Sequence, residues 1–128
     1  MTVLFVDGAL SPLERPNADR AGAWVLFEGT VRSPNKGLVV EALLYEAYPP
    51  MVEAEGLRIC EEAEKKWDIV ELHLRHGSGR LRPGEIAFQV GVLAGHREEA
   101  FAAARWIVEQ AKKRLPVWKE EKKGGKER

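Results

Sequence analysis

The sequence is poor in cysteine and contains no long hydrophobic stretch. Its one cysteine, Cys60, cannot form a disulfide within the chain or supply the paired thiolates of a CxxC metal site. The longest apolar run, counting glycine, extends only from Ala21 to Phe27, whereas a membrane-spanning helix needs about 20 apolar residues. The amino terminus has no positive flank and reaches Asp7 at once, so we do not expect a signal peptide. These absences predict a soluble, cytoplasmic protein.

An excess of charge of one sign is also absent. Twenty Lys and Arg balance twenty Asp and Glu, which argues against a general nucleic-acid-binding protein, because such proteins are normally basic. The charge is nevertheless uneven, since residues 112–128 contain eight basic and three acidic residues. This cationic end suits an anionic ligand or an acidic partner; the alternative is a solvated tail. From the length and the 45% of hydrophobic residues, we expect one domain over residues 1–121 and a flexible charged tail over residues 122–128.

The common catalytic and metal-binding motifs are missing as well. The sequence has no Walker loop and no GxGxxG, HExxH or GxSxG motif. Its three histidines, His73, His76 and His96, do not have metal-ligand spacing with other ligands, so we predict no metal site. Cys60 lies on the apolar side of a predicted helix and is expected to be a small buried hydrophobe. If the protein handles sulfur, its own thiol is therefore not the expected carrier.

The hydrophobic pattern predicts several strands and two helices. Alternating or continuous apolar residues predict strands over residues 2–6, 22–32, 38–48, 70–74 and 86–94. Apolar residues at helical spacing predict one helix after Pro49 and Pro50 and a second between His96 and Pro116, followed by a short extended segment over residues 117–119. We therefore expect an α+β fold in which two helices pack on a mixed or antiparallel sheet.

Two features predict how the strands are arranged. Residues 33–37, Ser-Pro-Asn-Lys-Gly, are a strong turn signal. The strands on either side, 22–32 and 38–48, are therefore expected to pair as an antiparallel hairpin. Residues 86–94 are almost entirely apolar, which is typical of a strand covered on both faces. We expect this strand in the centre of the sheet.

His96 and Arg97 form the first candidate site. They fall where a strand that ends in glycine turns into a helix, and Glu98 and Glu99 fit the first helical turn. Free N–H groups at a helix start favour an anion, and the arginine adds a planar donor fork for phosphate or carboxylate. The alternative is that both residues pair with the neighbouring glutamates.

Lys112 and Lys119 form the second candidate site. The first lies in the last turn of the second predicted helix, and the second follows Pro116 in an extended segment. Crowded cations lower one another's pKa, so one amine is a candidate nucleophile toward an acyl carbon or ketone while the other holds the oxyanion. The alternative for the basic residues at the helix end is complementation of the helix dipole.

Arg32 is a third candidate, because it ends a predicted strand beside the glycine-containing turn, where a ligand can approach the backbone. The alternative is an exposed arginine without a role. Phe27 and Trp118 are candidates to line a pocket and are also ordinary core candidates.

Several short runs, taken in order, form a pattern. They are Gly29–Gly37, Leu44–Tyr48 with Met51, Pro83–Glu85, His96–Arg97 with Ala100–Phe101, and Lys112 with Pro116–Glu121. Together, over about residues 22–121, they resemble the large, catalytic subunits of molybdopterin synthase, the MoaE family.

The resemblance implies an α/β-hammerhead fold and a homodimer in which each copy binds one small ubiquitin-like partner, giving a heterotetramer. The partner would carry sulfur as a thiocarboxylate on a C-terminal Gly-Gly tail that enters a pocket of this chain. The substrate would be cyclic pyranopterin monophosphate, which two sulfur transfers convert to molybdopterin. The chain would then be a sulfurtransferase without a cofactor.

The resemblance also implies residue roles. By position, Lys112 and Lys119 correspond to the catalytic lysines. Contacts with the substrate or with the partner's tail are implied for Thr30, Val31, Arg32, His96, Arg97, Lys112, Lys119, Glu120 and Glu121. A phosphate-bearing substrate agrees with the independent interpretation of His96 and Arg97 as an anion site.

Two positions depart from the family's pattern. Gly77 stands where an arginine usually follows the histidine that matches His76, which weakens the case for an anion contact there. Val117 replaces an aromatic residue or isoleucine, which is a change of packing. Two other functions are alternatives: a non-enzymatic phosphometabolite-sensing or adaptor domain, and an RNA-binding domain that uses the basic tail.

Overall fold

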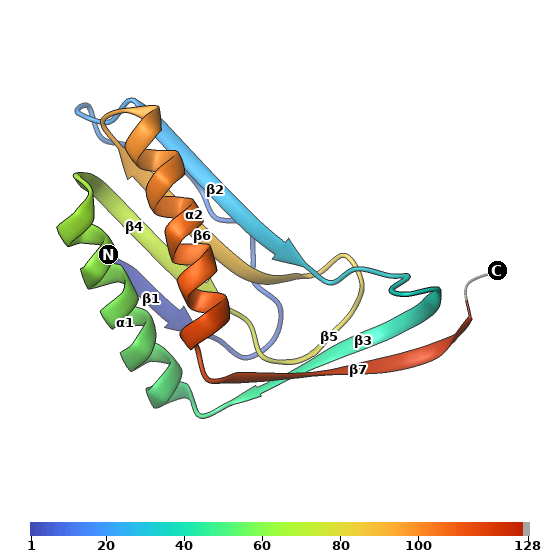
Figure 1. Ribbon diagram of the computed structural model, residues 1–128. Coiled ribbons are helices and arrows are strands. Elements are labelled where there is room, and N and C mark those ends of the chain that lie inside the picture. Colours follow the sequence, from blue (N-terminus) through green and yellow to red (C-terminus); the bar gives the residue numbers. More distant parts are fainter. Residues whose placement is uncertain (127–128) are drawn as a thin grey trace.

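In the computed structural model, which describes residues 1–126, seven strands form two adjacent sheets and two helices pack against one of them (Figure 1). In chain order the elements are β1 (Thr2–Phe5), β2 (Ala23–Thr30), β3 (Leu38–Ala47), α1 (Pro49–Lys66), β4 (Ile69–His76), β5 (Gly79–Leu81), β6 (Ile86–Ala94), α2 (Arg97–Arg114) and β7 (Val117–Lys126). The predicted α+β fold is confirmed. Among the described residues, no helix has the length and apolarity to cross a bilayer.

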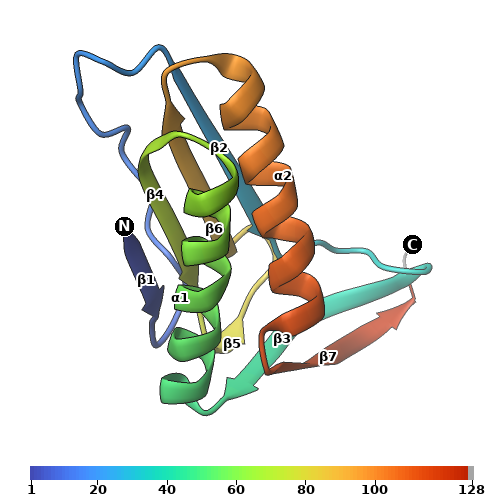
Figure 2. The same ribbon diagram turned by 60° about the vertical axis from the view of Figure 1, so that its left-hand side comes forward.

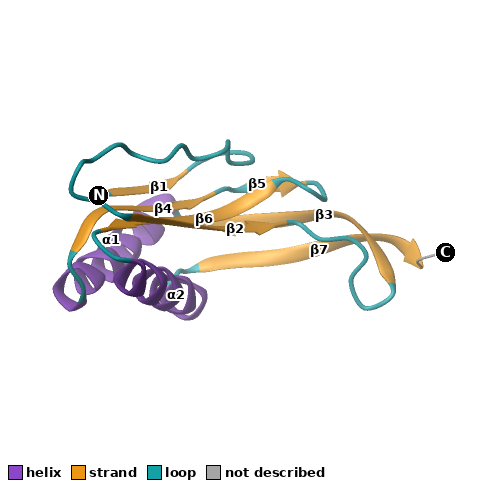
Figure 3. Ribbon diagram, turned by 90° about the horizontal axis from the view of Figure 1, so that it is seen from above, coloured by secondary structure: helices purple, strands orange, loops and turns teal. Residues whose placement is uncertain are grey.

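The larger sheet, which we call the helix-covered sheet, carries the main core. Its order is β1-β4-β6-β2, with β1 parallel to β4 and the other neighbours antiparallel. Both helices lie on one side of it (Figure 2, Figure 3). Alternate residues of β4, Leu72 and Leu74, are buried in this core, and α2 adds alanines and the fully buried Ile107. Burial of one such large side chain contributes about 1.5 to 3 kcal/mol.

Two expectations about this core are confirmed. β6 lies in the interior of the sheet order, and nearly all of its residues are buried. Cys60 on α1 is fully buried, and loss of solvent raises the pKa of its thiol to about 12. The thiol therefore stays protonated at neutral pH and is a poor nucleophile there.

The second sheet, which we call the arm sheet, has the order β5-β3-β7 and is antiparallel. Its long strands β3 and β7 extend past the ends of the helices (Figure 1). It has a small core of its own, formed by Val31, Val40, Leu43, Leu81 and Ala87, with Tyr45 packed against it. The arm sheet therefore depends on few buried side chains.

The predicted hairpin between residues 22–32 and 38–48 is wrong. The turn is present, since Asn35 and Leu38 exchange backbone hydrogen bonds and Lys36 has a positive φ of 52°. However, β2 pairs with β6, whereas β3 pairs with β5 and β7. The turn therefore leads from one sheet to the other, because the partners of both strands come from distant parts of the sequence.

Strand β7 is longer than the sequence predicted. The segment expected over residues 117–119 continues to Lys126 and pairs antiparallel with β3. Residues 122–126, expected in a flexible tail, thus form part of a strand; residues 127–128 of that tail lie outside the described residues. The reason is that β3 offers a backbone partner over its whole length, and charged side chains are common on an edge strand. The fold extends beyond the predicted boundary at residue 121.

Candidate active site

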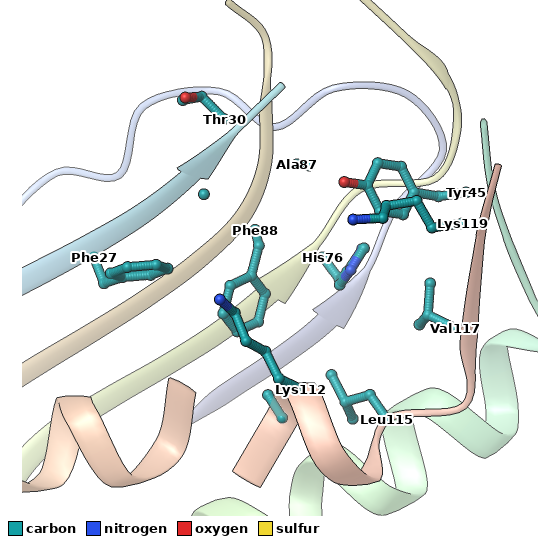
Figure 4. Close-up of a pocket in the computed structure, with 12 residues that line it drawn as sticks. Phe27, Thr30, Tyr45, His76, Ala87, Phe88, Lys112, Leu115, Val117 and Lys119 are labelled. Atoms are coloured by element: carbon teal, nitrogen blue, oxygen red, sulfur yellow. The ribbon is translucent and has the colours of Figure 1, made fainter. Parts of the chain in front are cut away.

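A cavity of about 310 Å³ lies where the two sheets meet the carboxyl-terminal end of α2 (Figure 4). Its lining comes from β2, β3, β4, β6, α2 and β7, with Leu115 at the link between α2 and β7. Two lysines and four ring-bearing side chains distinguish it chemically: Lys112, Lys119, Phe27, Tyr45, His76 and Phe88. The volume is at the lower end of the range for small-ligand sites, roughly 300 to 1,000 Å³.

Lys112 and Lys119 come together because the chain reverses direction between them. α2 ends at Arg114, Pro116 cannot continue the helix, and β7 then runs along β3. Lys119 lies opposite Tyr45 in the β3–β7 ladder, so both side chains share the face that borders the cavity (Figure 4). Within residues 1–122, whose side chains the structure describes, neither lysine forms an ion pair. Both are thus available to an anionic ligand.

The consecutive cations at the end of α2 differ in what they contact. Arg114 lies 2.8 Å from a carboxylate oxygen of Glu55 and 2.6 Å from one of Glu62, both on α1. Hydrogen bonds to Glu62 and Glu55 raise the pKa of Arg114, so this guanidinium is an attachment between the helices. Lys113 is exposed and does not line the cavity, whereas Lys112 does. A position at the end of α2 therefore does not by itself explain why Lys112 borders the cavity.

The cavity has an aromatic floor, formed by Phe27, Phe88, His76 and Tyr45. Neighbouring ring centroids lie 6.0 Å apart for Phe27 and Phe88, 5.7 Å for His76 and Phe88, and 5.2 Å for Tyr45 and His76. Burial raises the pKa of Tyr45 and lowers the pKa of His76, so both side chains are neutral at pH 7. The fixed positive charge of the cavity therefore comes from the lysines above this floor.

Thr30 lines the cavity, and the loop that follows β2 is attached to the arm sheet beside it. Nη2 of Arg32 donates to Oδ1 of Asn35 at 3.1 Å, and Nδ2 of Asn35 donates to Oε1 of Glu121 at 2.7 Å. This chain of three polar side chains, the Arg32–Asn35–Glu121 link, joins two of the predicted site residues. Asn35 was not predicted as a site residue, although its place in the turn signal made it visible in the sequence.

Two other predicted contact residues point elsewhere. Val31 is buried in the core of the arm sheet, its N–H donates to Glu85, and its carbonyl accepts from Gly84. Glu120 alternates with Lys119 along β7 and accepts from Lys122 at 2.8 Å on the exposed side. In this chain Val31 is packed in the core, and Glu120 is directed away from the cavity.

His96 and Arg97 lie at the other end of α2. Arg97 begins the helix and Lys112 lies in its last turn, so about 22 Å along the axis separates them at 1.5 Å per residue. Nδ1 of His96 lies 4.0 Å from a carboxylate oxygen of Glu99, as the alternative interpretation expects. Within one chain, the predicted anion site and the lysine cavity are therefore separate.

His76 lines the cavity but was not predicted from the sequence as a site residue. Its signal was present, because His76 continues the alternation of Leu72 and Leu74, where another apolar side chain is expected. Trp118, a predicted pocket candidate, is 69% exposed and alternates with the cavity-lining residues of β7. Within the described residues, no three His, Cys, Asp or Glu side chains gather as metal ligands.

Comparison with known proteins connects this chain to a family. The family model described as "MoaE protein" matches residues 7–114. The molybdopterin synthase catalytic subunit of Pyrococcus abyssi is 46% identical over 105 residues, which cover 82% of this chain and 71% of the relative. The structure of molybdopterin synthase from Staphylococcus aureus has a TM-score of 0.81 at 36% identity, covering 86% of this chain and 82% of that one.

A further structure shows the fold alone. It is a complex of subunits 1 and 2 of the molybdopterin-converting factor from Helicobacter pylori, with a TM-score of 0.74 at 19% identity, covering 96% of this chain and 88% of that one. The family match includes Lys112 and spans more than half of the chain. The resemblance predicted from the short sequence runs is thereby confirmed, and this chain belongs to the MoaE protein family.

Proposed function

We propose that this chain is the catalytic subunit of a molybdopterin synthase and acts as a sulfurtransferase in molybdenum cofactor biosynthesis. Its substrate is cyclic pyranopterin monophosphate, and its sulfur comes from the thiocarboxylated C-terminus of a small ubiquitin-like partner. The observation that carries the proposal is the convergence of Lys112 and Lys119 over the aromatic floor of one cavity, in a chain of the MoaE family. A cytoplasmic location belongs to the same proposal.

The cavity suits both reactants. A pterin is planar and aromatic, as are the side chains of Phe27 and Phe88 that form part of the floor. A thiocarboxylate is an anion, and the amines of Lys112 and Lys119, which form no ion pair within residues 1–122, attract it. A slender Gly-Gly tail fits an opening of this size better than a tail with bulky side chains. The Helicobacter pylori structure, a complex of two subunits, agrees with a partner of this kind.

The lysines have distinct roles in the proposed transfer. The thiocarboxylate sulfur uses a lone pair to bond to a carbon of the pyranopterin, and a C–O bond at that carbon breaks with its electron pair on the oxygen. Negative charge develops on the acyl oxygen when the acyl group is later released. Lys119 is essential to the sulfur transfer, and Lys112 positions or activates the acyl group. Charged donors placed where an oxyanion forms typically contribute about 100- to 1,000-fold in rate.

The substrate phosphate needs a cation in addition to Lys112 and Lys119. The residues that line the cavity of one chain do not include another. His96 and Arg97 suit this phosphate, but they lie about 22 Å along α2 from Lys112. We therefore include a homodimer in the proposal, in which a second copy brings its helix start to the cavity. With one small partner on each copy, the assembly is a heterotetramer. Arg32, held by Asn35, lies in the loop after cavity-lining Thr30.

The test is to mix each variant with thiocarboxylated partner and pyranopterin and to measure the molybdopterin formed. We expect Lys119→Ala to lower the rate by about 100- to 1,000-fold and Lys112→Ala by a smaller factor. Lys113→Ala is the matched control, because this neighbour is exposed outside the cavity. Near wild-type rates for both cavity variants would remove the mechanism. A wild-type chain that binds the pterin without forming product would instead favour the sensor alternative.

A further inference from the structure

His76 is a titratable side chain of the cavity for which the proposed transfer has as yet no role. It is the last residue of β4, on the face where Leu72 and Leu74 are buried in the core. It borders the lysine cavity and also a smaller hollow beside Leu115. In Figure 4 its ring lies between Phe88 and Tyr45. An imidazole thus stands where the strand pattern favours an apolar side chain.

The ring of His76 is fixed in one tautomer. Its Nδ1 lies 2.6 Å from the carbonyl oxygen of Gly77. A carbonyl oxygen only accepts, so Nδ1 carries the proton, and Nε2 of the neutral ring is left with a free lone pair. Contacts with Tyr45, Phe88 and Phe5, at centroid distances of 5.2, 5.7 and 5.8 Å, hold the ring in place. The result is a positioned proton acceptor.

The surroundings keep this imidazole neutral. Burial lowers the pKa of His76, and the hydrogen bond to Gly77 opposes this only in part. The charged or titratable groups that border the same two hollows are Lys112, Lys119 and Tyr45 in the cavity and Glu53 beside Leu115. His76 is therefore unprotonated at the pH at which the reaction would run.

The proposed transfer requires such an acceptor in its second half. Once sulfur is bonded to the pterin carbon, the partner's tail is joined to the pterin as an acyl thioester. A water oxygen must then bond to the acyl carbon, and the C–S bond breaks with its electron pair on sulfur. The products are a carboxylate tail and a pterin thiolate, with two protons released. An amine that holds the oxyanion must stay protonated, so it does not accept a proton from the water.

We propose that His76 is the general base of this hydrolysis, with Nε2 accepting a proton from the attacking water; this inference rests on the proposed function. The second proton leaves to solvent when the carboxylic acid ionises. The Gly77 carbonyl keeps the basic nitrogen available by holding the proton on Nδ1. No oxidant, reductant or metal is needed, because only water is consumed.

The experiment uses the full chain with thiocarboxylated partner and pyranopterin. Gln replaces the imidazole in His76→Gln, and His76→Phe keeps a ring in the aromatic floor. We expect either variant to form molybdopterin at least about 100-fold more slowly, as general-base catalysis contributes roughly 100- to 10,000-fold. We also expect the partner–pterin thioester to accumulate, detected by mass spectrometry as partner mass plus pterin.

The pH profile gives a second readout. The wild-type rate should fall as the pH drops through the pKa of His76, which lies below the ordinary histidine value, and this acid limb should be absent in the variants. His73→Gln is the matched control: this histidine is also on β4, contacts Trp24 on the other face of the sheet, and does not line the cavity. It should keep the wild-type profile without accumulating thioester.

The outcomes separate the two proposals. If the wild-type chain makes no molybdopterin from thiocarboxylated partner, the proposed function fails. If the wild type is active and the His76 variants keep its rate and its acid limb, or lose rate without accumulating thioester, only the inference fails. If thermal unfolding shows that both variants are unfolded at the assay temperature, the wild-type profile decides, and a rate without an inflection below pH 6.5 overturns the inference.

Discussion

The helix-covered sheet and the arm sheet are stabilised in different ways. The first is covered by α1 and α2 and contains a continuous core that joins both helices to β4 and β6. The second packs on a separate cluster of five buried residues, and its strands β3 and β7 extend past the helices (Figure 1). Lys112 belongs to the first region and Lys119 to the second, so the candidate active site lies at their junction.

This difference explains how the cavity combines a rigid wall from α2 with an accessible wall from β7. α2 is fixed by close packing, which holds Lys112 at a defined place beside the aromatic floor. β7 is fixed chiefly by its backbone ladder with β3, and Lys119 and the exposed Trp118 remain available for contacts with ligands or partners. A site assembled from a rigid element and a lightly buried one depends on the connections between them.

The largest expected effect comes from replacing one buried leucine by alanine in each of the two cores. Leu72 in the helix-covered sheet and Leu81 in the arm sheet are both essentially inaccessible to solvent, at 0% and 1%. We expect Leu72→Ala to lower the free energy of unfolding by about 3 to 5 kcal/mol and Leu81→Ala by about 2 to 3 kcal/mol, because a site in a small core collapses more easily around the missing atoms. Denaturant unfolding of both variants measures the difference.

A second readout shows where the loss acts. Hydrogen exchange in Leu81→Ala should accelerate mainly in the arm sheet, whereas Leu72→Ala should accelerate exchange throughout the molecule. Equal losses with the same exchange pattern would show that the two sheets unfold as one unit, and the distinction between them would not hold.

The next effect concerns Gly77, which connects β4 of one sheet to β5 of the other. A Cβ atom at this position would lie 2.6 Å from the carbonyl oxygen of Gly8, and the N–H of Gly77 is fixed by a hydrogen bond to Ala87. We expect Gly77→Ala to cost about 1 to 3 kcal/mol through this clash. Gly95→Ala is the control, because its nearest neighbour would be 3.8 Å away; equal melting temperatures for the two variants would refute the steric explanation.

The Gly77 contact also explains a departure from the family's pattern. The resemblance leads one to expect an arginine at this position, yet here the Gly8 backbone occupies the space of its Cβ. The carbonyl of Gly77 accepts from Nδ1 of His76 at the edge of the cavity.

The helices and the central strand could be predicted from sequence because their signals are local. Periodic apolar residues predicted both helices, and the apolar run of β6 predicted its interior place. The pairing of β2 and β3 could not be predicted, because a turn signal describes only the residues near Asn35 and not the distant strands that each partner selects. The length of β7 was missed for the same reason, since its charged residues pair through the backbone.

The candidate site was predictable in part. Lys112 and Lys119 were predicted from their placement around the end of the second helix, and the resemblance added their catalytic role. They line one cavity because Pro116 ends the helix between them. The contribution of His76 and Tyr45 depends on which face of each strand meets the cavity, which one sequence does not give. The separation of Arg97 from the lysines follows from the length of α2, and in the proposed homodimer a second copy would bring such groups together.

A smaller effect is expected from the Arg32–Asn35–Glu121 link, which joins the loop after β2 to the arm sheet. Asn35→Ala removes both hydrogen bonds and should cost about 0.5 to 1.5 kcal/mol of stability, together with a several-fold loss of activity as Arg32 becomes mobile. Asn35→Asp keeps an acceptor for Arg32 but brings a second carboxylate against Glu121. It should therefore restore activity more than stability, and the opposite order would contradict the role of the link.

The smallest effect lies within the helix-covered region, where Arg114 joins α2 to α1. Arg114→Ala should lower the free energy of unfolding by at most about 1 kcal/mol, because ion pairs near the surface contribute little. Arg105→Ala is the control, since its pair with Glu109 lies on the exposed side of one helix and should matter less.

The pH dependence of the Arg114 effect has a definite sign. Hydrogen bonds from Arg58 and Arg114 lower the pKa of Glu55 in the folded protein. A carboxylate with a lowered pKa stabilises the fold above its ordinary pKa, and this contribution is lost as the pH falls through the folded value. The difference in unfolding free energy between wild type and Arg114→Ala should therefore be present at pH 7 and shrink in acid. A difference that stayed constant down to pH 3 would mean that Arg114 acts through packing of its stem and not through charge.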